Sequence, residues 1–77
     1  MTTQLWLQQK ISEESGIDSS QIGFDQEFEQ FRMDSLSVIT LAYELEAFSG
    51  VDQIDPAVFT EFNTINKLAE WIQAQKK

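Results

Sequence analysis

The segment between Asp34 and Gly50 constrains the fold most, because its apolar residues recur at the spacing of an α-helix. These residues are Leu36, Ile39, Leu41, Ala42, Tyr43, Leu45 and Phe48. Asp34 is a good N-cap, since its carboxylate can accept a hydrogen bond from a backbone N–H of the first helical turn. Gly50 stands where helices often stop, because glycine tolerates a left-handed backbone there. The pattern predicts a helix that begins after Asp34 and ends before Gly50.

A second helical pattern opens the chain. It runs from Thr3 to about Ser15, with Thr2 or Thr3 as its cap and Gly16 at the usual stop position. Its apolar residues are Leu5, Trp6, Leu7 and Ile11, and the last two of these lie one helical turn apart. The segment therefore predicts the first helix of the protein.

The C-terminal part predicts one short helix and one longer helix. Asp55 and Pro56 pair a capping carboxylate with a proline at the first helical position, which starts a short helix through about Thr60. Thr64 or Asn63 then caps the last helix. The inner face of that helix is predicted to hold Ile65, Leu68, Ala69, Trp71 and Ile72.

The stretch from Ile17 to Arg32 has no regular period. Its turn formers are Asp18, Ser19, Ser20, Gly23 and Asp25, and its expected core anchors are Ile17, Ile22, Phe24, Phe28 and Phe31. A connection of this length is expected to pack down as an ordered loop, with a short helical turn near Gln26 to Gln30. The predicted fold is all-α, a small antiparallel-type bundle of three principal helices plus one short helix, with a long ordered first loop. Residues 1–77 are expected to form a single domain.

Two residue types that carry much of enzyme chemistry are missing from the chain. It has no cysteine and no histidine, so neither a disulfide nor a zinc-thiolate site can form. Nucleophilic and general-base catalysis at neutral pH lose their usual residues. No twelve-residue loop has the alternating acids, central glycine and terminal glutamate of a calcium-binding loop. The protein is therefore not expected to be an enzyme or to hold a metal, and any thiol chemistry must come from a cofactor.

The charge balance bears on the partners. The formal net charge is −8, and Arg32 is the only basic residue between Ile11 and Asn66. Nucleic acid is an unfavourable partner because lysine and arginine supply most of that affinity. Basic protein surfaces suit such a chain, although acidity can also serve solubility alone. No stretch has the length of a membrane span and the N-terminus lacks a signal-peptide pattern, so no membrane contact and a cytoplasmic location are expected.

Ser35 is the candidate functional residue. The run Met33-Asp34-Ser35-Leu36 places its hydroxyl at the start of the predicted central helix, beside a carboxylate. Unpaired backbone N–H groups and the positive end of the helix dipole favour a phosphodiester at such a position. A serine near a helix start is more often only a cap, so the motif needs support from the rest of the chain.

That support comes from a resemblance. Together with Leu41, Leu45-Glu46 and the run from Phe59 to Ile65, the segment resembles the acyl carrier protein family, whose Asp-Ser-Leu serine carries 4′-phosphopantetheine. The likeness covers nearly the whole chain. It implies that a phosphopantetheinyl transferase attaches the arm of coenzyme A to Ser35, and that the arm carries acyl groups as thioesters between enzymes. Within this resemblance Asp34 caps the helix and positions the serine, while Met33 and Leu36 shape the surface at the root of the arm.

The sequence is most similar to the polyketide-synthase type of this family. Peptidyl carriers commonly have Gly-Gly-His-Ser, whereas aspartate precedes Ser35 here. The run Phe-Thr-Glu-Phe followed by Thr-Ile also reads as the polyketide type. The resemblance then implies ketosynthase, acyltransferase and other synthase partners, and a monomer. Carriers that accept β-branches tend to have tryptophan six residues after the serine, where this chain has Leu41, so that role is not supported.

The sequence also departs from the family pattern. Arg32 stands where a glycine or small residue is usual, and Met33 replaces the commoner Leu, Ile or Val. Arg32 either contacts the cofactor phosphate or a partner enzyme, or pairs with Glu29 or Asp34 as a solvated arginine. Ser37 and Thr40 occupy positions where fatty-acid carriers present acids, so partner recognition is expected to rely more on apolar and polar contacts. Val38 is the candidate partner contact, with packing against the first loop as the alternative.

Other functions remain open at this point. Peptidyl and D-alanyl carriers share the arm and differ in the group loaded on it. A non-carrier reading is an acidic helical module that binds a basic protein surface without any cofactor. Trp6 and Trp71 are interpreted as core or rim aromatics rather than ligand contacts.

Overall fold

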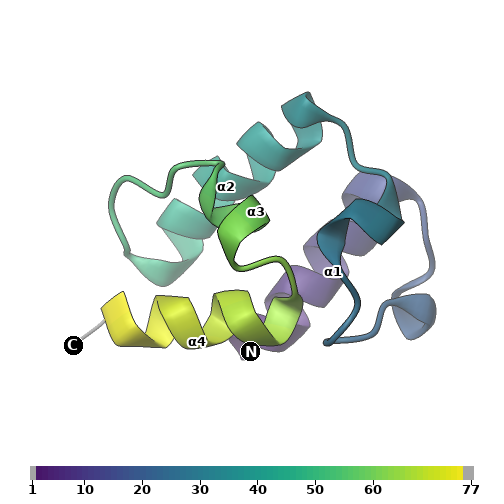
Figure 1. The fold of residues 1–77 in the computed structure, drawn as a ribbon, viewed down its shortest axis with the longest axis horizontal. Helices are drawn as coiled ribbons and strands as arrows, with labels where there is room; N and C mark the ends of the chain where they lie inside the picture. The colour runs from purple at the N-terminus through teal and green to yellow at the C-terminus, as the bar shows by residue number, and fades with distance from the viewer. Residues whose placement is uncertain (1, 76–77) are drawn as a thin grey trace.

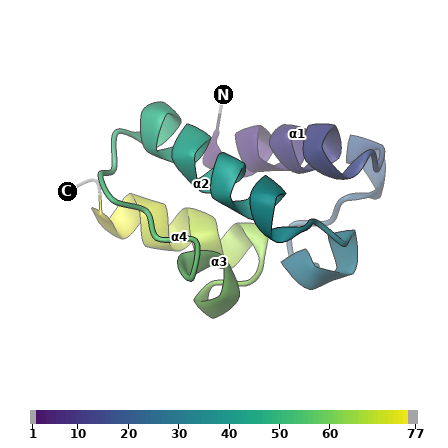
Figure 2. The same cartoon turned by 90° about the horizontal axis from the view of Figure 1, so that it is seen from above.

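The computed structural model describes residues 2–75 and is all-α over that range (Figure 1). The elements in chain order are α1 (Thr3–Ser15), η1 (Ser19–Gln21), η2 (Phe28–Phe31), α2 (Ser35–Ser49), α3 (Val58–Glu61) and α4 (Ile65–Gln75), where η marks a 3₁₀ helix. Helix α1 packs against both α2 and α4. Figure 2 shows α2 running back along α1 in the opposite sense. The predicted fold class, with three long helices and one short one, is confirmed.

The helix ends follow from the caps named in the sequence. Thr2 Oγ1 accepts a hydrogen bond of 3.2 Å from the N–H of Leu5 at the start of α1. Thr64 Oγ1 accepts one of 3.1 Å from the N–H of Lys67 in α4. Gly16 and Gly50 close α1 and α2 with φ angles of 78° and 77°, which a residue with a side chain adopts only at a cost.

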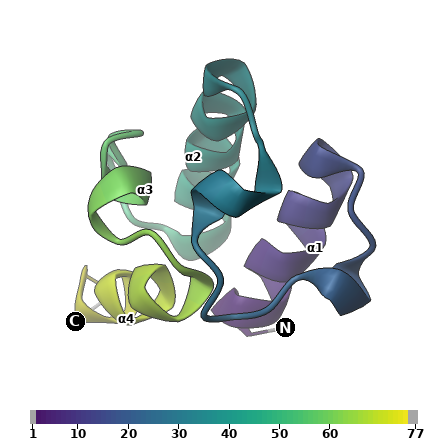
Figure 3. The same cartoon turned by 45° about the vertical axis from the view of Figure 1, so that its right-hand side comes forward.

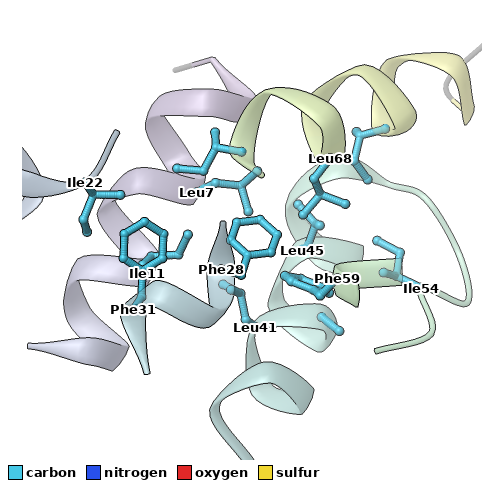
Figure 4. Close-up of a cluster of buried hydrophobic side chains, with 13 residues drawn as sticks. Leu7, Ile11, Ile22, Phe28, Phe31, Leu41, Leu45, Ile54, Phe59 and Leu68 are labelled. Atoms are coloured by element: carbon cyan, nitrogen blue, oxygen red, sulfur yellow. The ribbon is translucent and has the colours of Figure 1, made fainter. Parts of the chain in front are cut away.

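The core lies where α1, α2 and α4 meet the first loop (Figure 4). Each long helix supplies fully buried side chains, and the short helices η2 and α3 add aromatic rings. The buried hydrophobic residues are Leu7, Ile11, Ile22, Phe28, Phe31, Leu41, Ala42, Leu45, Ile54, Phe59, Ile65, Leu68, Ala69 and Ile72. Burial of this apolar surface is the main force that holds so small a domain together.

Helix α2 divides its apolar residues between two faces. Leu41, Ala42 and Leu45 are buried, whereas Leu36, Ile39 and Tyr43 are 71%, 52% and 75% exposed. The apolar spacing predicted the helix correctly but did not separate these faces, because both sets recur at helical intervals. α2 is thus apolar on its outer face as well as its inner one.

The long first loop is ordered, as expected, but its local structure differs in detail. The short turn expected near Gln26 to Gln30 is a 3₁₀ helix at Phe28–Phe31, and η1 was not predicted. Of the five expected anchors, three are buried and Ile17 and Phe24 are partly buried. Two hydrogen bonds to residues distant in sequence hold this loop. The N–H of Phe28 donates to Asn63 O at 2.8 Å, and the N–H of Asn66 donates to Phe24 O at 3.0 Å.

Helix α3 begins later than predicted. Asp55 Oδ1 accepts a hydrogen bond of 2.8 Å from the N–H of Ala57, which closes a turn at Pro56 and Ala57 before the helix begins at Val58. The aspartate therefore caps this turn rather than the helix itself. α3 is one turn long and ends at Glu61, one residue after the predicted end.

The two tryptophans lie at the rim of the core. Trp6 is half-buried and stacks on Phe48, with ring centroids 4.6 Å apart and planes at 12°, and Lys10 Nζ lies 5.7 Å from the Trp6 ring. Trp71, predicted on the inner face of α4, is half-buried against Phe62 at 5.9 Å. No helix within residues 2–75 has the length and apolar character needed to cross a membrane.

Candidate functional site

Ser35 is the first residue of α2 and its side chain is exposed. Asp34 precedes it as the N-cap in extended conformation, and Asp34 Oδ1 accepts a hydrogen bond of 2.8 Å from the N–H of Ser37. None of the hydrogen bonds found among residues 2–75 involves the Ser35 hydroxyl, whereas Ser12, Ser15 and Ser49 donate theirs to backbone carbonyls. Figure 3 shows this end of α2 as the part of the helix farthest from α4. The Ser35 hydroxyl is therefore accessible to solvent and is not held by any hydrogen bond found among the described residues.

The Asp34 carboxylate stays ionised at neutral pH. Its pKa is lowered from the ordinary 3.8, first by the hydrogen bond from the backbone N–H of Ser37 and then by that of the Ser37 side chain. A negative charge at the first turn also matches the positive end of the helix dipole. The carboxylate thus fixes the start of α2, and with it the direction in which Ser35 is presented.

A pH prediction follows for Asp34. Because its pKa is lower in the folded than in the unfolded state, its stabilisation is complete above the unfolded value of about 4 and is lost as pH falls through the folded value. We expect Asp34→Asn, which keeps an oxygen acceptor, to show a shallower decline of the free energy of unfolding below pH 4. Asp18 has a pKa lowered in the same way by Ser20, so part of the decline remains. Urea unfolding at a series of pH values measures this, and identical slopes in both proteins would contradict it.

A groove of about 250 Å³ is lined by Met33 and Val38, which flank Ser35 in the sequence. Met33 and Val38 line it from the side of α2, both half-buried, and Phe28 and Phe59 lie at its base with ring centroids 5.5 Å apart. The remaining lining residues are Glu27, Glu29, Thr60 and Asn63. Val38 thus packs against the core and also lines the groove. The groove offers both apolar surface and hydrogen-bonding groups close to the start of α2.

Arg32 occupies an unusual backbone position. It ends η2 in the left-handed region, with φ 56° and ψ 35°, and its N–H donates to Glu29 O at 3.2 Å. Such a conformation favours glycine, which gives a physical reason for the small residue that the family resemblance led us to expect there. Its side chain is exposed, and neither ion pair found within residues 2–75 joins it to Glu29 or Asp34. The alternative that Arg32 is neutralised by these carboxylates is therefore not observed.

The two acids of α2 interact with other groups of the chain. Glu44 pairs with Lys10 at 3.9 Å, and Glu46 Oε2 accepts a hydrogen bond of 2.8 Å from the N–H of Ile54. Ile39 and Tyr43 lie one and two turns beyond Ser35 on the same side of the helix, and Leu36 adjoins it. We call Leu36, Ile39 and Tyr43 the outer stripe of α2.

The site combines expected and unexpected residues. Met33, Asp34, Ser35 and Val38 were named from the sequence and do lie together around the start of α2. Phe28, Phe59, Thr60 and Asn63 were missed as site residues, because nothing in the sequence links η2 and α3 to this helix. Ile39 and Tyr43 were also missed as surface residues, although their spacing of four and eight residues from Ser35 was a usable signal. No group of metal ligands occurs in the described part of the chain.

The geometry suits attachment of a phosphate ester. Ser35 carries an exposed hydroxyl on the first turn of a 15-residue helix, and the positive dipole end of a helix is favourable to a phosphodiester. The groove close to the start of α2 can receive a chain with both apolar and amide groups.

Comparisons with known proteins agree with this chemistry. The sequence model of the family described as "Phosphopantetheine attachment site" matches residues 5–72. The chain is 36% identical over 72 residues to the acyl carrier protein TtuC of Teredinibacter turnerae, covering 94% of this chain and 82% of that one. Its fold is similar to that of a free-standing peptidyl carrier protein from an uncharacterized secondary metabolic pathway of Acinetobacter baumannii. That comparison has a TM-score of 0.89 at 21% identity and covers 97% of this chain and 92% of the other, and it concerns the fold alone.

Proposed function

Because the chain belongs to the phosphopantetheine attachment-site family of carrier proteins, we propose that Ser35 is the serine that bears its 4′-phosphopantetheine arm. Members of this family carry the arm covalently on a serine and act as carriers, not as catalysts. The observation that carries the assignment is the exposed Ser35 hydroxyl at the capped start of α2, not engaged by other groups of the described residues. Ser12, Ser15 and Ser49 donate their hydroxyls to backbone carbonyls, and the side chain of Ser37 interacts with the Asp34 carboxylate.

Each neighbouring residue has a role in this proposal. Asp34 fixes the first turn, and the N–H groups and dipole of α2 favour the phosphodiester. Met33 and Val38 offer apolar surface for the first part of the arm, with Thr60 and Asn63 as polar partners across the groove. The arm supplies a thiol, which this cysteine-free chain lacks, for holding an acyl group as a thioester.

The function that we propose is the transport of acyl or ketide intermediates between enzymes, by residues 1–77 as one carrier domain. A tethered intermediate reaches each active site at a high effective concentration. Aspartate before Ser35 supports a polyketide role, with ketosynthase, acyltransferase and other synthase enzymes as partners. The fold neighbour is a peptidyl carrier, which makes an aminoacyl or peptidyl cargo the second candidate. The mass of the group loaded in producing cells separates the two.

The outer stripe of α2 is the proposed docking surface for the phosphopantetheinyl transferase and the synthase enzymes. Its three side chains are exposed and lie close to Ser35 along the helix, while Glu44 pairs with Lys10 at the surface and Glu46 accepts a hydrogen bond from the N–H of Ile54. An apolar cleft on the partner suits this face better than a cluster of basic side chains. We infer that each enzyme that must reach Ser35 presents an apolar cleft to this face.

This surface gives a measurable prediction. Ile39→Ala and Tyr43→Ala are each expected to lower kcat/KM for loading by a broad-specificity transferase about tenfold, the usual loss for a central interface residue. Their free energies of unfolding should stay within about 0.5 kcal/mol of wild type, since both side chains are exposed. Leu5→Ala on α1, also exposed, is the matched control and should load normally. Equal loading of all three variants would refute the docking surface.

The carrier role itself is tested by incubating the protein with coenzyme A and a broad-specificity phosphopantetheinyl transferase. A gain in intact mass equal to one phosphopantetheine supports the proposal. The absence of any gain, with the transferase active on a known carrier, favours the acidic interaction module instead.

A further inference from the structure

Arg32 is an isolated cation in an acidic protein. It is the only basic residue between Ile11 and Asn66 in a chain of net charge −8. Lys10 is paired with Glu13 and Glu44, and Lys67 donates to the Asn63 side chain at 3.4 Å. Arg32 is exposed and belongs to no ion pair found within residues 2–75. Its charge is therefore available to a ligand from outside the chain.

The backbone at this residue is also unusual. Its φ of 56° is one of only two positive values at non-glycine residues in the described range, the other being Gln53 at 60°. Glycine would adopt this conformation without steric strain. Strained backbone conformations cluster at functional sites, and Arg32 lies three residues before Ser35.

Arg32 is close enough to serve Ser35. Three residues of chain separate their Cα atoms by at most about 11 Å, and an arginine side chain is long and flexible. The intervening Asp34 carboxylate is bonded to the N–H of Ser37 in the first turn of α2, which directs it toward the helix. Glu29 is bonded to Arg32 only through its backbone carbonyl. Within residues 2–75 the ion pairs found do not join any carboxylate of the loop to the guanidinium.

We propose that the Arg32 guanidinium pairs with the phosphodiester of the arm on Ser35, an inference that rests on the proposed function. A guanidinium donates two parallel hydrogen bonds to phosphate oxygens, and the phosphodiester carries one negative charge. Arg32 is then a positioning residue that restrains the root of the arm. Because the pair is exposed, salt weakens it.

Nuclear magnetic resonance of the loaded protein tests the pair directly. Wild type is compared with Arg32→Gln, Arg32→Lys and Arg32→Gly, and with Lys67→Gln as a control that removes a charge from α4. Each protein is loaded with coenzyme A and a transferase, and loading is checked by intact mass. The measurements are the ³¹P shift of the phosphodiester and the shift of the Arg32 Nε–Hε signal between unloaded and loaded protein.

We expect loading to move the Arg32 Nε–Hε signal at about 20 mM salt and to move it less than half as far at about 500 mM. Arg32→Gln and Arg32→Gly should shift the ³¹P signal alike, Arg32→Lys should shift it less, and Lys67→Gln should leave it unchanged. An unmoved Arg32 Nε–Hε signal overturns the pairing of Arg32 with the phosphodiester. A ³¹P change in Arg32→Gly alone also overturns it, because that change reports the backbone and not the guanidinium. Wild type that gains no mass overturns the carrier function and the pair together, whereas normal mass gain with unmoved signals overturns the pair only.

Discussion

Replacing Ser35 with alanine is expected to abolish phosphopantetheine loading, with the rate falling to the background of a reaction without carrier protein. The variant lacks the only atom that we assign as the nucleophile toward coenzyme A. The side chain is exposed and makes no hydrogen bond within the described residues, so the fold should be unchanged. Intact mass after incubation with a transferase gives the measurement, and circular dichroism confirms the fold.

Ser37→Ala is the matched control for this experiment. Ser37 lies two residues further along the same helix, and the substitution keeps the hydrogen bond of 2.8 Å from its backbone N–H to Asp34 while removing only the contribution of its side chain. It should load at close to the wild-type rate. Mass gain in Ser35→Ala, or its loss in Ser37→Ala alone, would contradict the assignment of Ser35.

The second large effect concerns stability. Leu45→Ala is expected to lower the free energy of unfolding by about 2–5 kcal/mol, the usual range for truncating a buried leucine. Leu45 is fully buried between the long helices, and such a loss is a large share of the stability of a 77-residue domain. Urea unfolding followed by circular dichroism measures the change.

Leu36→Ala provides the comparison on the same helix. Leu36 is 71% exposed, so the free energy of unfolding should change by no more than about 0.5 kcal/mol. Leucine and alanine both have high helix propensity, so the difference between the two substitutions mainly reports burial. Similar destabilisation by both would mean that the assigned inner and outer faces of α2 are wrong.

Local signals in the sequence predicted the helix ends well. Thr2, Asp34 and Thr64 each act as caps through their own side chains, and Gly16 and Gly50 close helices with left-handed backbones. These interactions join residues at most four positions apart, so the sequence alone contains the necessary information. Asp55 shows the limit, because an aspartate before proline also caps a turn.

Contacts between distant segments were beyond sequence reasoning. The groove close to the start of α2 brings Met33 and Val38 together with Phe59 and Thr60, and the first loop is held by bonds to Asn63 and Asn66. The left-handed backbone at Arg32 could not be predicted either, because an arginine, unlike a glycine, does not indicate such a conformation. Family membership was recognised from the motif and its context, whereas the cargo depends on enzymes that the chain does not encode.

Localising the modification tests the central claim most directly. The protein is produced together with a phosphopantetheinyl transferase, digested with trypsin, and analysed by tandem mass spectrometry. Cleavage after Arg32 and Lys67 releases residues 33–67, which contain Ser35, Ser37 and Ser49, while residues 11–32 contain the four other serines. We predict one phosphopantetheine on the 33–67 peptide, with fragment ions that place it on Ser35. A modification on any other serine, or a fully unmodified protein beside an active transferase, would contradict this account.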